Sequence, residues 1–210
     1  MNDKVLQGYG VADARYKNSN EAYKNTYTTE FGALVPTPLI FPDNPHNDLV
    51  LKSKNVLDFG CGIGRNLLWI MNDTEAHYWG IDTSPEMRQY FWDIQHPRYQ
   101  PRVTLLPNFE GMGDVKLDVV VVTFVFQHIG YRPEPPAMNI TDITQEINKY
   151  CHDDTVWILY EHDWEEPWIE RWMMENGIVF DFYKRDYTGI EELTHRSPHH
   201  MMIFKGKVDE

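Results

Sequence analysis

From Asn55 onward the chain alternates short apolar runs with segments whose apolar residues recur every three or four positions. The short runs, which are bounded by polar or turn-forming residues, predict β-strands. The predicted strands are Asn55–Phe59, His77–Ile81, Arg102–Leu106, Leu117–Phe124, Thr155–Tyr160, Ile178–Tyr183 and His200–Lys205. The fourth is apolar almost throughout, which is typical of a central parallel strand covered on both faces.

Segments of helical spacing separate these strands. The predicted helices are Gly64–Asn72, a helix that opens at Pro85 after the capping residues Thr83 and Ser84, one over Ile140–Tyr150, and one that opens at Pro167 and stops before Gly177. The alternation of strands and helices predicts an α/β fold with a doubly wound, mostly parallel sheet.

The first 50 residues follow a different pattern. They are polar and aromatic with weak periodicity, and the stretch from Pro36 to Pro45 contains four prolines, which favour extended or turning backbone. We expect residues 1–50 to pack over the rest of the chain, and residues 51–210 to form one main domain.

Composition narrows the functional classes. The 210 residues carry a formal net charge of −13 with no visible basic cluster, so we expect no nucleic-acid partner. The sequence has neither an apolar run long enough to span a membrane nor an apolar signal segment at its N-terminus. Its two cysteines, Cys61 and Cys151, are too few for a disulfide framework, which predicts free thiols and a cytoplasmic location.

The acidic residues are concentrated in the C-terminal part of the chain. The segment from Cys151 to Glu192 contains twelve Asp and Glu residues against three Lys and Arg residues, so it contributes −9 by itself. One interpretation is a solvated surface that keeps the chain soluble. The other is an acidic wall that attracts a cationic substrate.

The most informative segment is Val56–Asn66, VLDFGCGIGRN, in which Asp58 and three spaced glycines lead into a helix. Glycines permit a sharp turn and close approach of a ligand, and the open amides of the new helix face that ligand. The spacing G-x-G-x-G differs from the G-x-G-x-x-G that serves a pyrophosphate. A carboxylate two residues before the first glycine suits an ammonium group better, so an NAD-dependent reductase is the weaker alternative.

A second acid, Asp82, ends the second predicted strand 24 residues after Asp58, where a carboxylate can accept both hydroxyls of a ribose. A ribose joined to an amino-acid end describes S-adenosyl-L-methionine (SAM). Together DFGCGIGRN and GIDTSPEM closely resemble the first two motifs of class I SAM-dependent methyltransferases, and FVFQHIG fits the end of their fourth strand. The resemblance extends from Asn55 to Tyr160, about half of the chain.

This resemblance implies a seven-stranded sheet with an antiparallel last strand, a helical lid formed by residues 1–50, and SAM as the cofactor. The residues that it places along the methionine end of SAM are Asp58, Gly60, Cys61, Gly62, Gly64 and Asn66. Those that it places along the rest of SAM are Asp82 at the ribose, Thr83 and Met87 beside the adenosine, Asn108 and Phe109 at the adenine, and Phe124 at the sulfonium. Asn108 departs from the family pattern, because many relatives have an aspartate at that place.

Methyl transfer depends on aligning the acceptor and excluding water, so no catalytic triad is expected. His128 follows the predicted central strand, over whose carboxyl end ligands bind, and is a candidate base or acceptor contact; relatives also carry a structural histidine there. Glu161 is a candidate for orienting an acceptor amine, with a solvated loop residue as the alternative. The same resemblance makes Tyr16 a candidate for closing the lid over SAM, with ordinary packing or a dimer contact as the alternative.

Two further patterns have plain structural interpretations. The histidines of THRSPHH, residues 194–200, have neither a cysteine nor helical spacing beside them, so we expect no metal site. Trp164, Trp168 and Trp172 recur every four residues, which favours the buried face of a helix over an acceptor surface.

The sequence therefore predicts a SAM-dependent methyltransferase that acts on the oxygen or nitrogen of a small molecule, for which a cationic acceptor is one interpretation of the acidic segment. The alternatives are a protein or peptide methyltransferase and a SAM-binding protein without catalysis. The sequence predicts no oligomeric state.

Overall fold

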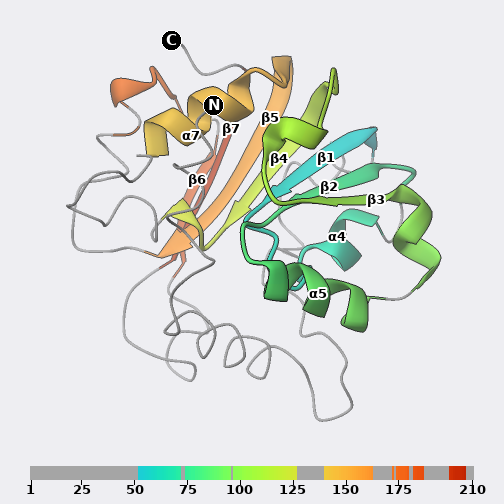
Figure 1. Ribbon diagram of the computed structural model, residues 1–210. Helices are drawn as coiled ribbons and strands as arrows, with labels where there is room; N and C mark the ends of the chain where they lie inside the picture. Colours follow the sequence, from blue (N-terminus) through green and yellow to red (C-terminus); the bar gives the residue numbers. More distant parts are fainter. Residues whose placement is uncertain are drawn as a thin grey trace. The chain divides into compact units, whose positions relative to one another are not determined.

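A computed structural model (Figure 1) describes residues 52–71, 74–95, 97–126, 140–162, 172, 174–179, 182–186 and 199–206. The predicted lid with Tyr16, the loop residue His128, and the tryptophans Trp164 and Trp168 lie outside the described residues. The chain divides into two compact units after Gly113, and each unit is described by itself.

Among its described residues, the first unit has three parallel strands in the order β3-β2-β1. They are β1 (Asn55–Phe59), β2 (His77–Ile81) and β3 (Val103–Leu106). The helices α4 (Leu67–Met71) and α5 (Pro85–Ile94) lie on one face of these strands, as Figure 1 shows. Two 3₁₀ turns, η1 (Pro97–Arg102) and η2 (Phe109–Gly111), flank β3.

Helix α5 follows the rules for a helix start. Ser84 is its N-cap and accepts a hydrogen bond from the Met87 amide at 3.2 Å, while Pro85 occupies the first turn, where its missing N–H costs nothing. Met87 and Phe91 are buried on its inner face, and the Phe91 ring lies 5.8 Å from the Tyr78 ring of β2. The predicted cap and apolar face of this helix are confirmed.

The described part of the second unit has four strands in the order β4-β5-β7-β6. They are β4 (Leu117–Thr123), β5 (Cys151–His162), β6 (Phe182–Asp186) and β7 (His199–Lys205). Strands β4 and β5 are parallel, whereas β7 is antiparallel to both β5 and β6. The unit also contains α7 (Ile140–Asn148), whose residues Ile140, Ile143 and Ile147 are buried as the spacing predicts.

An aromatic cluster forms part of the core of the second unit. Trp172 is 2% exposed and donates its Nε1–H to Thr144 Oγ1 at 2.9 Å. Its ring lies 5.5 Å from that of Phe126 and 5.8 Å from that of Phe204, which stacks on Trp157. For Trp172, the interpretation as a core residue is confirmed.

The mostly parallel α/β architecture and the antiparallel last strand are confirmed, while a single seven-stranded sheet joining the two units stays a prediction. Three predicted starts are wrong by three or four residues. The helix expected from Gly64 begins at Leu67, because the positive φ of 81° at Gly64 belongs to the preceding turn. The strand expected over Ile178–Tyr183 begins at Phe182, and Val179 is 80% exposed.

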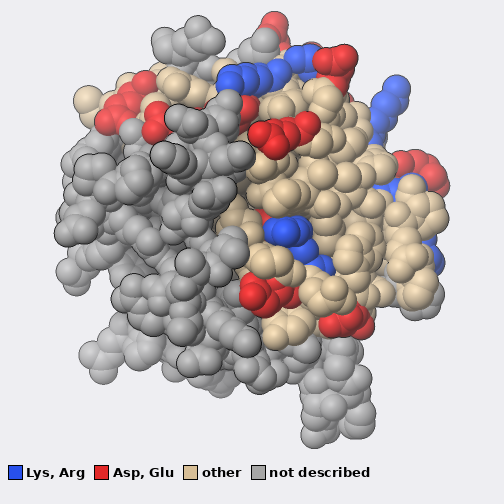
Figure 2. Space-filling model, in the orientation of Figure 1, with Lys and Arg blue, Asp and Glu red and all other residues tan. Residues whose placement is uncertain are grey.

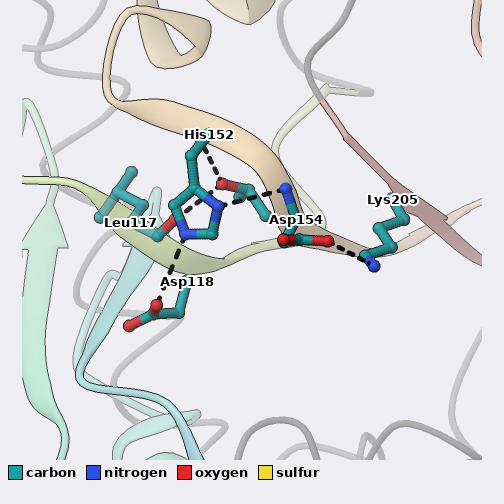
Figure 3. A network of polar contacts seen from close by, with 6 residues as sticks. Leu117, Asp118, His152, Asp154 and Lys205 are labelled. Atoms are coloured by element: carbon teal, nitrogen blue, oxygen red, sulfur yellow. Dashed lines mark hydrogen bonds and ion pairs between the residues drawn. The ribbon is translucent and has the colours of Figure 1, made fainter.

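The third difference concerns β5, which starts at Cys151 rather than Thr155. Figure 3 shows why its polar first residues belong to the strand: His152 Nε2 lies 3.5 Å from Asp118 Oδ1 of β4, and Asp154 pairs with Lys205 of β7 at 2.6 Å. Thr155 Oγ1–H also donates to the Leu117 carbonyl of β4 at 2.7 Å. These contacts join residues distant in sequence, so a local pattern does not reveal them.

No helix within the described residues is long and apolar enough to cross a bilayer.

Candidate functional site

The glycine-rich loop turns through three left-handed residues. Gly60, Gly62 and Gly64 have φ values of 70°, 51° and 81°, which side chains other than glycine adopt only with strain. The amides of Gly60 and Cys61 both donate to the Ile81 carbonyl, at 2.7 and 3.1 Å. These bonds attach the loop after β1 to the end of β2.

Gly64 has a packing role in addition to its backbone conformation. A Cβ added there would lie 2.4 Å from the Phe91 ring and 2.8 Å from the Gln95 amide nitrogen. Gln95 Nε2–H donates to the Ile63 carbonyl at 2.9 Å, so the C-terminal end of α5 holds the loop directly. The third glycine therefore lets α5 approach the loop.

Asp82 lies at the carboxyl end of β2 and is half-buried. Its Oδ2 accepts the Gly62 amide at 2.8 Å, and its Oδ1 accepts the Ser84 amide at 2.9 Å. Burial raises the pKa of this carboxyl, and the two amides oppose that rise. Because a carboxylate oxygen can accept more than one hydrogen bond, the group can still accept ligand hydroxyls.

Asp58 lies deeper than its place in the motif suggests, since it is 1% exposed. Its Oδ1 accepts Asn66 Nδ2–H at 2.9 Å, and its Oδ2 accepts the Tyr78 hydroxyl at 2.5 Å. Burial raises the pKa of Asp58 to about 7 although both hydrogen bonds lower it, and the nearby charge of Asp82 raises it further. A cation near this group would favour its ionised form.

Tyr78 is a site residue that the sequence reasoning missed. Gly80 pairs with Asp58 across β1 and β2, and a Cβ on Gly80 would meet Leu105, Tyr78 and the Cys61 sulfur at 2.5, 2.9 and 3.0 Å. A glycine inside a strand indicates such a close approach. Gly80 was therefore the sequence signal that could have pointed to Tyr78.

Cys61 is buried inside the loop, and its pKa is raised well above the usual value by burial and by the charges of Asp82 and Asp58. A thiol with a raised pKa stays neutral, which makes it a poor nucleophile.

The adenine-side candidates surround the end of β3. Asn108 caps η2 by accepting the Glu110 amide at 3.0 Å. Phe109 is buried and stacks on Phe59 of β1, with ring centroids 5.7 Å apart. Asp82 donates its amide to the Leu106 carbonyl at 3.1 Å, which joins the ends of β2 and β3. The first unit thus brings the candidates on β1, β2 and β3 to one edge of its strands.

Two candidates lie in the second unit, at the ends of neighbouring strands. Phe124 follows β4, is half-buried, and has a positive φ of 56°. Glu161, on β5, is fully buried, so the interpretation as a solvated loop residue is wrong. Its Oε1 accepts the amides of Val125 and Phe126 at 2.8 and 3.0 Å.

No group of three or more potential metal ligands occurs in the part of the chain that the structure describes. His195 lies outside that part.

Comparison with known proteins adds family information to this geometry. A family model for a methyltransferase domain matches residues 57–156, which include most of β1, the glycine loop and the strands β2, β3 and β4. The match covers just under half of the chain and identifies a methyltransferase domain there. No curated protein matches the sequence.

Solved structures share the methyltransferase fold at low sequence identity. A Listeria monocytogenes protein described as a SAM-dependent methyltransferase is 12% identical, with a TM-score of 0.56 over 77% of this chain and 97% of that chain. An O-methyltransferase from a trans-AT PKS multienzyme of Brevibacillus brevis, in complex with S-adenosyl-L-homocysteine, is 15% identical, with a TM-score of 0.53 over 76% of this chain and 71% of that chain. An rRNA methylase from Streptococcus thermophilus is 9% identical, with a TM-score of 0.52 over 81% of this chain and 99% of that chain.

The residues of the methyltransferase fit SAM in their chemistry. The half-buried Asp82 carboxylate keeps acceptor capacity for ribose hydroxyls. Asp58 has a pKa of about 7, so a cationic neighbour such as the ammonium group of SAM would favour its ionised form. The three left-handed glycines leave the loop without side chains at the points where a ligand would approach.

Proposed function

We propose that this methyltransferase transfers the methyl group of SAM to an oxygen or nitrogen atom of a small-molecule acceptor. The observation that carries the cofactor site is the Asp82 carboxylate, fixed by the Gly62 and Ser84 amides at the carboxyl end of β2. In this proposal Asp82 binds the ribose, Thr83 and Met87 lie beside the adenosine, and Asn108 and Phe109 contact the adenine.

In the same proposal, the glycine loop binds the methionine end of SAM. Asp58 acts on the ammonium group through its charge and through Asn66, which it holds at 2.9 Å. Gly60, Gly62 and the backbone of Cys61 supply a surface without side-chain bulk. Gly64 contributes by letting α5 support the loop.

SAM supplies a methyl group already activated by its sulfonium, so the protein mainly orients the acceptor and excludes water. Phe124 faces the sulfonium in this proposal, and His128 contacts the acceptor or removes its proton. Tyr16, in the proposed lid of residues 1–50, covers the site.

The charge of the chain supports a neutral or cationic acceptor. With a net charge of −13, the protein repels polyanions, and the acidic segment from Cys151 to Glu192 would attract positive groups. On the face drawn in Figure 2, no broad basic patch is visible among the described residues.

The cofactor proposal is tested by calorimetric titration with SAM and S-adenosylhomocysteine (SAH), with NADH as the control. Wild-type protein should bind the SAM pair and not NADH, and Asp82→Ala should weaken binding by about tenfold or more, because it removes charge-assisted hydrogen bonds to the ribose. Binding of NADH in place of SAM would reject the proposal.

The acceptor proposal needs a second assay, in which SAH production is followed with a library of small hydroxyl and amino compounds. Turnover with a member of this library supports the proposal, and its absence across a broad library contradicts it.

A protein or peptide acceptor is the second candidate, and the same acidic segment favours it because basic peptides would be attracted. SAM with a labelled methyl group separates the two candidates. Label retained with macromolecules after filtration indicates a protein acceptor, and label in the filtrate indicates a small molecule.

A further inference from the structure

The carboxyl group of Asp58 is enclosed within the first unit, and each of its oxygens has its own donor. Tyr78 of β2 donates its hydroxyl to Oδ2 at 2.5 Å, and Asn66, directly before α4, donates its Nδ2–H to Oδ1 at 2.9 Å. Asp58 is 1% exposed and Tyr78 is fully buried, so water does not replace a donor that is lost. All three residues belong to the first unit, and so do the contacts between them.

The fold fixes the ring of Tyr78 so that its hydroxyl meets Asp58. Gly80 pairs with Asp58 across the two strands, and a Cβ on Gly80 would lie only 2.9 Å from the Tyr78 ring. The Phe91 ring of α5 packs against the same ring, with centroids 5.8 Å apart. Burial and the charge of Asp58 raise the pKa of Tyr78 well above its usual value, so the hydroxyl keeps the proton that it donates.

Tyr78 has a larger effect on Asp58 than the second donor has. Burial raises the pKa of Asp58, and the hydrogen bond from Tyr78 opposes that rise more strongly than the one from Asn66. Without the Tyr78 hydroxyl, Oδ2 would lose its donor in a buried place, and the neutral carboxyl would be favoured.

Other titratable groups act on Asp58 from the loop and from the end of β2. The negative charge of Asp82 raises the pKa of Asp58. Arg88 of α5 donates to the Asp82 carbonyl and lowers the pKa of the Asp82 carboxyl. Cys61, in the loop, has a raised pKa and stays neutral. The hydrogen bonds that favour a charged Asp58 therefore come from Tyr78 and Asn66.

We propose that Tyr78 is a positioning residue of the cofactor site: its hydroxyl binds Asp58 Oδ2 and so keeps the carboxylate charged and oriented for the ammonium group of SAM. The role of Asp58 toward the ammonium group rests on the proposed function. Tyr78 acts through Asp58 and needs no contact of its own with the cofactor.

SAH and methylthioadenosine distinguish this role from general support of the loop, because methylthioadenosine lacks the amino-acid end of SAH. Calorimetry on the full chain from pH 5 to 8 compares the wild type with Tyr78→Phe, Asp58→Asn and the double variant. Tyr99→Phe is the matched control, since Tyr99 is a buried tyrosine of the same unit whose hydroxyl accepts a hydrogen bond from Arg98.

Tyr78→Phe should weaken SAH binding by about tenfold at about pH 6 and by less at about pH 8, because the carboxyl without its donor ionises at higher pH. Binding of methylthioadenosine should not change. In the Asp58→Asn background, Tyr78→Phe should have little effect on SAH binding, since the group through which it acts is gone. Tyr99→Phe should resemble the wild type throughout.

Equal weakening of SAH and methylthioadenosine by Tyr78→Phe would overturn the proposal, because it would show that Tyr78 only supports the loop. An unaltered pH profile in Tyr78→Phe, or an undiminished effect of this substitution in the Asp58→Asn background, would do the same. Failure of the wild type to bind SAH would instead reject the proposed function.

The effect of Tyr78 on Asp58 is measured without any ligand by the carboxyl ¹³C resonance of Asp58, which is assigned by its loss in Asp58→Asn. This resonance should titrate with a pKa of about 7 in the wild type and at higher pH in Tyr78→Phe. Identical titrations would overturn the proposal whatever the ligands do.

If Tyr78→Phe does not fold, 3-fluorotyrosine at position 78 takes its place. It keeps the ring and the hydroxyl, and fluorine makes the hydroxyl a stronger donor. Asp58 should then titrate at lower pH than in the wild type, and SAH affinity should become constant at lower pH. An unchanged titration would overturn the proposal.

Discussion

At the scale of single residues, the site depends on how each carboxylate is satisfied. Asp58, Asp82 and Glu161 are all acids near strand ends, but their surroundings differ. Asp82 is half-buried and held by two amides, whereas Asp58 is buried against Tyr78 and Asn66. Glu161 is fully buried and binds two consecutive amides. Burial and hydrogen bonding, rather than residue type, therefore give each acid its own role.

The first prediction concerns the pH dependence of SAH binding. The pKa of Asp58 is about 7 without ligand, and the ammonium group of SAH favours the ionised form, so binding should release a proton. Affinity should rise with pH, by nearly tenfold per unit below about pH 6, and become constant above about pH 7 to 8. Calorimetry from pH 5 to 8 measures this. Asp58→Asn should flatten the profile, and a wild-type profile without slope would contradict the prediction.

The same pKa predicts how stability changes with pH. Because the pKa of Asp58 is raised from 3.8 to about 7, the folded state binds a proton between these values that the unfolded state does not. The contribution of Asp58 to stability should therefore fall as pH rises from 4 to 7, by up to about 4 kcal/mol at about 1.4 kcal/mol per unit. Urea unfolding of wild type and Asp58→Asn across this range measures the difference. Parallel pH profiles for the two proteins would refute it.

At the scale of elements, the glycine loop and α5 form one structure. Gly64 lies against the Phe91 ring, and Gln95 from the end of α5 donates to the Ile63 carbonyl. The helix therefore sets the shape of the loop as much as the strand before it does. In the second unit, β5 has the corresponding role, because it fixes the chain that leaves β4.

Gly64→Ala tests the contact between loop and helix. It combines the cost of a positive φ, about 1–2 kcal/mol, with overpacking against Phe91, about 1–3 kcal/mol, so we expect a loss of roughly 2–5 kcal/mol. Gly113→Ala is the matched control, since Gly113 has a φ of 60° but nothing within 4 Å of an added Cβ, and should lose only the first of these. Denaturant unfolding compares them, and equal losses would show that packing against α5 contributes nothing.

At the scale of the whole molecule, a methyltransferase domain is identified, and the choice of acceptor depends on surface chemistry. The fold is shared with an O-methyltransferase and with an rRNA methylase, so the fold alone does not select the acceptor. The net charge of −13 is a property of this chain, and it opposes a nucleic-acid acceptor.

We therefore expect no binding of a labelled RNA oligonucleotide at about 0.15 M salt and protein concentrations up to about 10⁻⁴ M, where proteins with a basic face bind non-specifically. Fluorescence anisotropy measures this. A labelled oligolysine of similar length is the control of opposite charge, and its binding should weaken as salt is added. Binding of the RNA would contradict the choice of a neutral or cationic acceptor.

Much of the fold followed from local pattern. The apolar runs predicted β1, β2 and β4 almost to the residue, and the Ser84–Pro85 pair predicted the start of α5. These features depend on neighbours within a few positions, which a sequence displays directly. The polar beginning of β5 was missed, because contacts with Asp118 and Lys205 stabilise it from other strands.

The sequence by itself indicated a SAM-dependent methyltransferase and the candidate cofactor residues, because glycines and acids at fixed spacing are properties of a continuous motif. Only the tertiary structure revealed that Tyr78 and Asn66 satisfy a buried Asp58, and that Glu161 binds the backbone beyond β4. Burial and hydrogen-bond partners set the pKa and the availability of a carboxylate. Those partners come from other strands or loops of the folded chain, and so they exist only once it has folded.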